Sequence, residues 1–273
     1  MDGTTLIIGA GGKTGTRVAA RLAKQGPLRP VSRRTSPPFD WKDRRSWAPA
    51  LQGATRAYVT FQPDLAIAGA DADIAELARL GREAGLEQMV LLSGRGEPGA
   101  QRAEQALIES GLDWNVVRAS WFAQNFSEGV FVDGIRAGLL ALPAGPVPEP
   151  FIDADDIADV ATAALTDPSL RNRIFEVTGP RALTFAEAVD IIAAATGRPV
   201  AYRQISPADF ADGLTPYLPP DVIALLVSLF TEVLDGRNIA TADGVQQALG
   251  HAPRDFADYA ALVAATGVWE TVP

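Results

Sequence analysis

The feature of this sequence that most constrains its fold is a glycine-rich turn joining an apolar strand to an amphipathic helix. Residues 4–8 (TTLII) carry no charge and are β-branched or apolar, as expected of a strand buried on both faces. Gly9, Gly12 and Gly15 follow at three-residue intervals, and apolar residues then recur at helical spacing from Val18 to Ala23. A strand, a glycine turn and a helix in this order predict the first half of a dinucleotide-binding βαβ unit.

Each of these glycines has its own expected role. Gly9 can adopt backbone angles that other residues avoid as the chain leaves the strand. Gly12 lacks a Cβ and lets a pyrophosphate approach the main chain, and Gly15 lets the helix pack closely on the sheet. The helix amino end offers N–H groups and a partial positive charge to the phosphates. The predicted cofactor contacts in this turn are Gly9, Gly11, Gly12, Lys13, Thr14 and Gly15.

Two other interpretations of the turn are disfavoured. Gly12-Lys13-Thr14 resembles the end of the phosphate-binding loop of nucleotide hydrolases, but Ile7 occupies the position where that loop requires a glycine. A glycine turn that binds nothing is the other alternative, and the strand before it and the helix after it argue against that. The spacing is Gly-x-x-Gly-x-x-Gly rather than Gly-x-Gly-x-x-Gly, so the common dinucleotide fingerprint applies by analogy.

A second short strand, 28–31, is expected to end in Ser32-Arg33-Arg34. An acidic residue at this point typically binds the ribose hydroxyl of NAD, whereas a basic residue suits the 2′-phosphate of NADP. The pair of arginines therefore favours NADPH/NADP as cofactor, with NAD as a possible alternative and two solvated arginines as the interpretation without a ligand. We predict Ser32, Arg33 and Arg34 as cofactor-binding residues.

The rest of the chain alternates strands and helices. Further strands are expected at 57–60, 88–92, 114–118 and 173–178, with helices between them, and residues 35–50 are expected to form a loop. This predicts an α/β protein, a Rossmann-type doubly wound parallel sheet with a small, mainly helical C-terminal lobe. We expect a dinucleotide-binding domain at 1–150. Residues 151–273 would add the remaining strands and a substrate-covering lobe, interleaved into one compact unit.

The second half begins with a proline-rich stretch. Residues 139–150 carry four prolines and are expected to cross between lobes. Beyond it, helices are predicted at 157–165 and at 183–196, the latter with Thr184 and Glu187 in a capping box, and a strand at 200–205. The helix expected near 222–234 is apolar over much of its circumference and could cover a pocket or form a homodimer contact.

Composition excludes several classes of function. Cysteine is absent and His251 is the single histidine, which leaves no basis for thiolate catalysis or a histidine metal site, so no metal is expected. A net charge of −9 without a basic stripe argues against nucleic acid. The start lacks a basic leader and residues 222–230 are too short to span a bilayer, so we expect a cytoplasmic protein that does not associate with membranes.

Residues that follow strand ends are the candidates for the reaction site, because ligands of open α/β sheets bind beyond the carboxyl ends of the strands. Phe61 and Gln62 are expected on the nicotinamide side. Ser93 and Ser120 are the best local hydroxyls for orienting a substrate or relaying a proton, and Ser93 and Ala119 are also expected to contact the cofactor. Aromatic and basic residues that could wall the substrate pocket are Phe61, Arg95, Trp121, Phe122, Phe126 and Phe151, although each ring taken alone is more often part of a core.

Taken together, these stretches resemble the NmrA-like branch of the atypical short-chain dehydrogenase/reductases. The resemblance rests on residues 9–15, 32–34, 91–93, 111–114, 117–126 and 151–158, and extends over nearly the whole chain. It is nearest to bacterial relatives of the ergot-alkaloid reductases (festuclavine/agroclavine dehydrogenases), and NAD(P)H:quinone oxidoreductases and triphenylmethane reductases are also similar. It implies a Rossmann fold, bound NADP(H) and a pocket between the sheet edge and a C-terminal lobe. Ala119 stands where the branch commonly has proline after the arginine.

The chain lacks the usual proton-transfer pair of short-chain dehydrogenases. Its four tyrosines are Tyr58, Tyr202, Tyr217 and Tyr259, and none is followed four residues later by a lysine. Alcohol–ketone chemistry by a Tyr-x-x-x-Lys pair is therefore excluded. The sequence predicts an NADPH-dependent reductase of a small conjugated or cationic acceptor such as a quinone or iminium, held in a site that excludes water. A non-catalytic NADP-binding redox sensor and a non-redox isomerase or cyclase that retains the fold remain as alternatives.

Overall fold

The computed structural model describes residues 3–270, which divide into two compact units connected by several passages of the chain. The first unit contains the residues up to Ala119, Ala154–Val177 and Asp243–Ala252. The second contains Ser120–Asp153, Thr178–Ala242 and the residues from Pro253 onward. This division differs from the expected boundary at residue 150, because the chain leaves the first unit after residue 119 and returns to it at 154.

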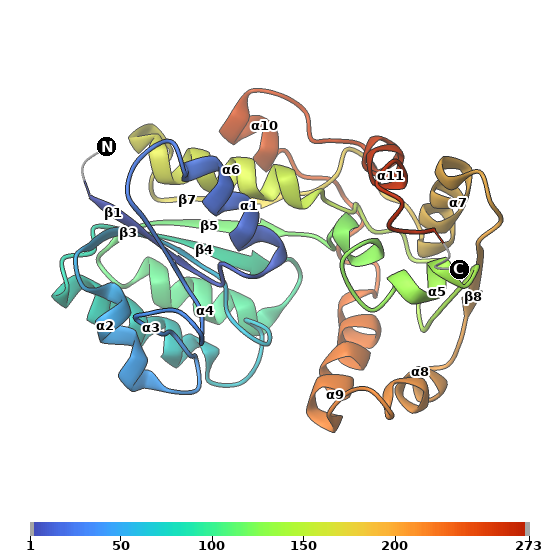
Figure 1. Ribbon diagram of the computed structural model, residues 1–273, viewed down its shortest axis with the longest axis horizontal. Helices are drawn as coiled ribbons and strands as arrows, with labels where there is room; N and C mark the ends of the chain where they lie inside the picture. Colours follow the sequence, from blue (N-terminus) through green and yellow to red (C-terminus); the bar gives the residue numbers. More distant parts are fainter. Residues whose placement is uncertain (1–2, 271–273) are drawn as a thin grey trace. The chain divides into compact units, whose positions relative to one another are not determined.

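The first unit is an α/β structure whose helices and strands alternate along the chain (Figure 1). In chain order its elements are β1 (Thr4–Ile8), α1 (Lys13–Leu22), β2 (Leu28–Val31), η1 (Arg44–Ser46), α2 (Trp47–Leu51), β3 (Ala54–Val59), α3 (Ala70–Glu83), β4 (Gln88–Gly94), α4 (Pro98–Ile108), β5 (Asp113–Ala119), α6 (Ala154–Thr166), η3 (Pro168–Leu170), β7 (Arg173–Val177) and α10 (Gly244–Leu249).

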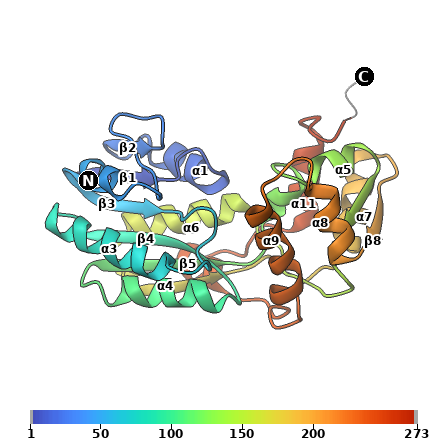
Figure 2. The ribbon, with the colours of Figure 1, turned by 90° about the horizontal axis from the view of Figure 1, so that it is seen from below.

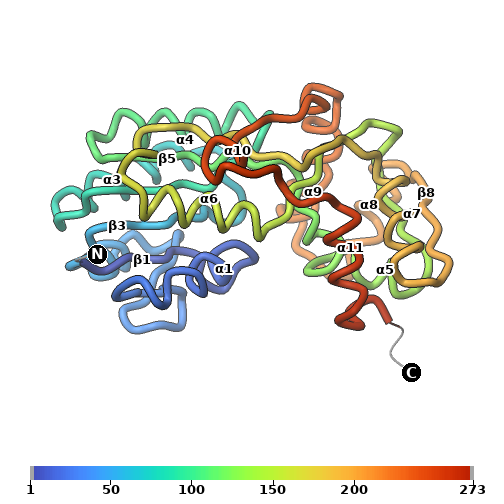
Figure 3. The backbone as a smooth tube through the Cα atoms, turned by 90° about the horizontal axis from the view of Figure 1, so that it is seen from above, coloured from blue at the N-terminus to red at the C-terminus, as the bar shows by residue number. Residues whose placement is uncertain are grey.

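Within the described residues, the strands of this unit form one six-stranded sheet in the order β2-β1-β3-β4-β5-β7. Every neighbouring pair is parallel, so all the carboxyl ends lie at one edge (Figure 3). Strand β2 is at the outer edge of the sheet, which explains how it tolerates Pro30, since an edge strand can lose one hydrogen-bond donor. The doubly wound parallel sheet predicted from the sequence is confirmed.

Both faces of the sheet are covered, which accounts for the continuous apolar run in β1. Leu6 and Ile8 belong to the core on the side of α2, α3 and α4, whereas Ile7 points to the opposite side, and all three are at most 1% exposed. Helices α1 and α6 pack together on the other face (Figure 2). A fully buried strand of this kind lacks the alternation of polar and apolar residues that marks a half-exposed one.

The order of the strands defines where a ligand can bind. The chain leaves β1 through α1 to reach β2 on one side, whereas β3 lies on the other side of β1. The connections therefore diverge at the carboxyl ends of β1 and β3, and this is the point at which open α/β sheets leave a crevice for ligands. In this protein the glycine turn after β1 and the segment after β3 lie side by side at this position.

The second unit combines a two-stranded parallel sheet with short helices. Its elements are η2 (Ala123–Phe126), α5 (Val132–Arg136), β6 (Leu139–Leu142), α7 (Phe185–Thr196), β8 (Ala201–Gln204), α8 (Pro207–Leu214), α9 (Pro220–Ser228), the π-helical turn η4 (Leu229–Val233) and α11 (Phe256–Ala264). The predicted capping box is confirmed at α7. Thr184 Oγ1 accepts from the backbone N–H of Glu187, and the Glu187 carboxylate accepts from the backbone N–H of Thr184. Helices make up most of this unit, as expected.

Two predicted loops contain regular structure. Residues 35–50 include the turn η1 and most of α2, where Trp47 is fully buried and its Nε1 donates to Asp40 O over 2.8 Å. The proline-rich stretch 139–150 begins with β6, which pairs with β8. Both errors have the same origin, since prolines suggested irregular chain where packing imposes short elements. Within residues 3–270 no helix is long and apolar enough to cross a membrane.

Candidate active site

The glycine turn after β1 has the geometry that the sequence predicts. Gly9 has a φ of +86°, and Gly12 N–H donates back to Gly9 O over 2.9 Å, which closes the turn directly before α1. The first turn of α1 has no acidic residue, and its N-cap residue, Gly12, has no side chain to satisfy the leading N–H groups. The amino end of α1 is therefore suited to an anion, because it presents N–H donors and the positive end of the helix dipole.

Close packing explains why two of the glycines cannot carry a side chain. A Cβ at Gly15 would collide with the backbone of Gly9, and a Cβ at Gly9 would collide with Thr60 Oγ1. By contrast, a Cβ at Gly11 would meet nothing within 4 Å. Gly15 thus brings α1 against the turn, and the open side of the turn at Gly11 is the surface that a pyrophosphate could approach.

Two other predicted residues of the turn differ in exposure. Lys13 is half-buried, and its carbonyl accepts from Arg17 Nη1 over 2.8 Å. Thr14 is only 3% exposed. Its side chain lies beside the Tyr58 hydroxyl, which is itself buried, and that burial raises the pKa of Tyr58. Thr14 can therefore offer a phosphate its backbone rather than its hydroxyl, and Tyr58 is a poor proton donor.

The segment after β3 lies beside the glycine turn, because Thr60 donates from both its N–H and its Oγ1 to Ile8 O at the end of β1 over 3.2 Å. Trp41 Nε1 donates to Thr60 O over 3.1 Å, and the rings of Trp41 and Phe61 have centroids 4.4 Å apart. Phe61 is half-buried and packs on the core, whereas Gln62 is exposed. Both predicted residues therefore lie at the carboxyl edge of the sheet, and Phe61 packs against the indole of Trp41.

The turn after β2 displays the two predicted arginines. Its backbone is tied down at Ser32, whose N–H donates to Thr35 Oγ1 over 2.9 Å and whose carbonyl accepts from Phe39 N–H. Arg33 and Arg34 are both exposed. Within residues 3–270 neither guanidinium makes an ion pair or a hydrogen bond. Two unpaired cations on an ordered turn leave their full donor capacity to a ligand phosphate.

A group of ion pairs joins α1 to α6. Arg21 contacts Asp155 at 2.8 Å and Asp159 at 2.5 Å, and Arg17 contacts Asp155 at 3.4 Å. Burial alone would raise the pKa of Asp155, but the hydrogen bond from Arg21 and the charges of both arginines outweigh it and hold that pKa below its ordinary value of 3.8. The acidic start of α6 therefore anchors the helix that carries the glycine turn.

We expect the Asp155→Asn variant to have a lower melting temperature at pH 7, by the equivalent of about 1 kcal/mol or less, because the pair is partly exposed. A carboxylate with a depressed pKa in the folded state stabilises the protein above its unfolded-state pKa, and this contribution disappears as the pH falls. The difference in melting temperature between Asp155→Asn and wild type should therefore disappear below about pH 3.8. Asp133→Asn, at a carboxylate 93% exposed, is the control; equal effects of both variants would contradict this account.

The predicted hydroxyls are both committed to protein acceptors. Ser93, at the end of β4, donates to the buried Glu104 Oε1 over 2.5 Å. Glu104 also accepts hydrogen bonds from Arg118, and Arg118 donates a further one to Glu176. Glu176 in turn accepts from Arg95 Nε over 2.6 Å. The predicted pocket residue Arg95 is therefore paired, and its backbone N–H donates to the buried Ala119. This network holds the exits of β4 and β5 together.

In the second unit, Ser120 donates to Pro150 O over 2.5 Å and is 4% exposed. Two of the predicted pocket aromatics lie in its interior: Phe126 is 0% exposed and Phe151 is 2% exposed, and their ring centroids are 5.4 Å apart. The structure therefore places these two rings in the core of that unit, because they pack on each other and on neighbouring rings. Trp121 and Phe122 are only half-buried and keep a surface that a ligand could touch.

One carboxylate at the sheet edge is absent from the sequence predictions. Glu97 lies three residues beyond β4, at the N-cap of α4, and is half-buried without capping that helix through its side chain. A Cβ added to Gly94 would collide with the Glu97 carboxylate, so this group packs directly on the exit of β4. No motif marks Glu97; the signal available in the sequence was an acidic residue shortly after the end of a strand.

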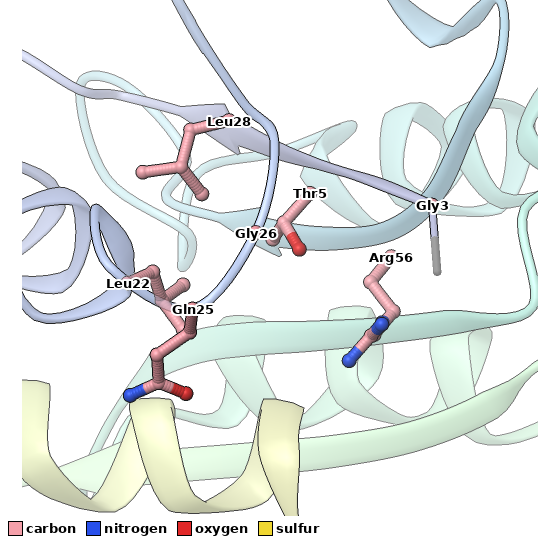
Figure 4. Close-up of a pocket in the computed structure, with 7 residues that line it drawn as sticks. All are labelled: Gly3, Thr5, Leu22, Gln25, Gly26, Leu28 and Arg56. Carbon is pink, nitrogen blue, oxygen red and sulfur yellow. The ribbon is translucent and has the colours of Figure 1, made fainter. Parts of the chain in front are cut away.

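The small cavity in Figure 4 lies at the other end of the sheet and is not part of this site. It is lined by residues at the start of β1 and β2, the end of α1 and the side chain of Arg56 (Gly3, Thr5, Leu22, Gln25, Gly26, Leu28 and Arg56). Its volume of about 10 Å³ is that of a single water. A cavity of this size is too small to hold a dinucleotide.

Comparison with known proteins places these features in a family context. The model of the NmrA-like family matches residues 102–260. An uncharacterized oxidoreductase, YesF, from Bacillus subtilis is 32% identical over 97% of each chain. Festuclavine dehydrogenase from Aspergillus fumigatus is 30% identical over 94% of this chain and 96% of its own. The solved structure of the NADPH-dependent quinone oxidoreductase QOR2 from Escherichia coli, complexed with NADPH, superposes with a TM-score of 0.79 at 18% identity, over 95% of this chain and 99% of that one.

Proposed function

Since this chain belongs to the NmrA-like family, we propose that it is an NADPH-dependent reductase that passes a hydride to a small conjugated or cationic acceptor, such as a quinone or an iminium. Relatives named as oxidoreductases and as a festuclavine dehydrogenase support the reductase activity. One observation carries the proposal. Within the described part of the chain, the amino end of α1 has no side-chain cap, and the unpaired Arg33 and Arg34 lie after β2, the strand next to the one that leads into α1.

The residues present fit this cofactor. The open side of the turn at Gly11 leaves room beside the backbone, and the start of α1 would hold the pyrophosphate. Arg33 and Arg34 lie after β2, next to β1, where they would bind the 2′-phosphate that distinguishes NADPH from NADH. Phe61 would border the nicotinamide, whose C4 supplies the hydride when the cofactor is bound.

The chain offers no tyrosine suited to alcohol–ketone chemistry. Tyr259 donates its hydroxyl to Ser127 over 2.7 Å, and Tyr202 donates to Ala144 O over 2.6 Å. Burial raises the pKa of Tyr202 to about 12. Tyr217 is exposed, and no lysine follows any of these residues at the required spacing. Acceptors that are already electrophilic fit this composition, because the hydride can add to them without a tyrosine proton.

The test is anaerobic NADPH oxidation, followed at 340 nm, with a panel of quinones, enones, cyclic iminium ions and cationic dyes. We expect saturable turnover with at least one class and slower turnover with NADH. Tight NADPH binding without turnover over the whole panel would contradict the reductase proposal.

That second result would favour a different function, an NADP-binding redox sensor without catalysis. The absence of a Tyr-x-x-x-Lys pair is the observation in its favour. A sensor of this kind would bind the cofactor without turning over any acceptor, with similar affinity for the oxidised and reduced forms. A non-redox isomerase or cyclase would instead convert a substrate with no net change in NADPH.

A further inference from the structure

We propose that the Glu97 carboxyl group is the proton donor of this protein for neutral conjugated carbonyl acceptors, such as quinones and enones, which become anions on accepting a hydride. The inference rests on the proposed reductase function. It concerns only residues of the first unit.

Two contacts fix the position of Glu97 and of the helix start that carries it. The carboxylate packs on Gly94 at the carboxyl end of β4, the strand next to β3, and the carboxyl end of β3 lies beside the end of β1 that leads into the glycine turn. From the other side, the segment after β3 lies against the start of α4, because a Cβ at Gly99 would collide with Ala66 O. Strands lie about 4.8 Å apart, so a dinucleotide that crosses the sheet edge from β1 reaches the ends of β3 and β4.

The environment of Glu97 favours the protonated form. Burial raises the pKa of its carboxyl to about 8, with a further contribution from the negative charge of Asp64 in the segment after β3. The nearest cations along the chain are occupied elsewhere: Arg95 pairs with Glu176, and Arg102 donates to Pro98 O over 3.3 Å. Within residues 3–270 the Glu97 carboxylate accepts no hydrogen bond. At neutral pH this group therefore holds a proton that it can give away.

The proton completes the reaction of a neutral acceptor. Hydride transfer oxidises the dihydronicotinamide and reduces the acceptor, which is left as an enolate or a hydroquinone monoanion. The O–H bond of the Glu97 carboxyl breaks, a new O–H bond forms on the anionic oxygen, and the Glu97 carboxylate then takes a proton from water. A cationic acceptor becomes neutral on hydride transfer and needs no such proton. Glu97 should therefore matter for one class of acceptor and not for the other.

The hydroxyl of Ser93, at the end of β4, is a poorer donor. Ser93 already gives its hydrogen to Glu104, which in turn is paired with Arg118. A serine in that network could pass on a proton only by breaking a buried hydrogen bond. Glu97 makes no such bond among the described residues and can release its proton without breaking one.

The kinetic test compares Glu97→Gln with wild type for a neutral quinone and for a cationic dye, both reduced by NADPH. We expect kcat for the quinone to fall about 100-fold or more, as for loss of a general acid, with the dye rate within twofold and NADPH affinity unchanged. Gly94→Ala should cause the same selective loss, because the added methyl group displaces the flexible carboxylate. Glu109→Gln, at the other end of α4, is the matched control and should change neither rate.

A titration of the protein without cofactor gives a readout other than activity. With ¹³C-labelled glutamate carboxyls, the Glu97 signal should titrate near pH 8 and move to lower pH in Asp64→Asn. The folded state would then keep this proton up to about pH 8, whereas the unfolded state loses it near pH 4.5. The free energy of unfolding should therefore fall as the pH rises from about 4.5 to about 8. In Glu97→Gln this pH dependence should be weaker.

Each outcome decides a different question. Equal losses with both acceptors, no loss with the quinone, or titration of Glu97 near pH 4.5 would overturn the proton-donor assignment while leaving the reductase intact. Absence of NADPH oxidation with every acceptor would instead overturn the proposed function, and the assignment of Glu97 with it.

Discussion

The Gly15→Ala variant is expected to bind NADPH at least 100-fold more weakly and to unfold at a lower temperature than wild type. The added methyl group would collide with Gly9 O and with the backbone of Ala10, and no flexible side chain is available to yield. Overpacking of this kind typically costs about 1–3 kcal/mol. Because relief requires α1 to move away from the turn, the N–H groups that bind the pyrophosphate would move with it. Calorimetric titration and thermal unfolding measure the two effects.

The control for this prediction is Gly213→Ala in α8, where a Cβ meets nothing within 4 Å. Alanine is the better helix former, by about 1 kcal/mol, so this variant should be as stable as wild type or more so, with unchanged cofactor affinity. If Gly15→Ala bound NADPH as tightly as Gly213→Ala does, the amino end of α1 would not be the pyrophosphate site.

The double variant Arg33→Ala/Arg34→Ala is expected to change the choice of cofactor. Hydrogen bonds to charged groups contribute about 1.5–3 kcal/mol each, so losing both arginines should raise the Kd for NADPH by about 100-fold or more. The affinity for NADH, which lacks the 2′-phosphate, should change little. Since both side chains are exposed and unpaired within residues 3–270, the melting temperature should stay within a degree or two of wild type.

Arg45→Ala serves as the matched control, because Arg45 is an exposed arginine of the same region that pairs only with its neighbour Asp43 among the described residues. It removes the same charge and should leave both affinities unaltered. If the double variant lost affinity for NADPH and NADH equally, or for neither, these arginines would not bind the 2′-phosphate.

The sequence predicts most of the fold because its main patterns are local. The buried run of β1, the positive φ of Gly9 and the capping box of Thr184 and Glu187 depend on residues close together in the chain, and all are confirmed. The family resemblance is confirmed as well. Helix α4 begins at Pro98, a residue that suits the first position of a helix because its missing N–H would have no partner there.

The site is less predictable where it depends on contacts between distant residues. Nothing in the local sequence indicates that Ser93 meets Glu104, that Arg95 meets Glu176 or that Asp64 lies near Glu97. The aromatic residues illustrate the same limit. Trp121 and Phe126 lie five residues apart after the same strand, yet one keeps an exposed surface and the other is fully enclosed by neighbouring rings. Such differences arise from packing, which a periodic pattern cannot specify.

The most direct test of this account is a crystal structure of the protein with NADPH. We expect the pyrophosphate at the backbone of Gly11 and Gly12, the 2′-phosphate beside Arg33 or Arg34, and the nicotinamide toward Phe61. A nucleotide bound elsewhere, or a 2′-phosphate that points into solvent away from both arginines, would contradict the account.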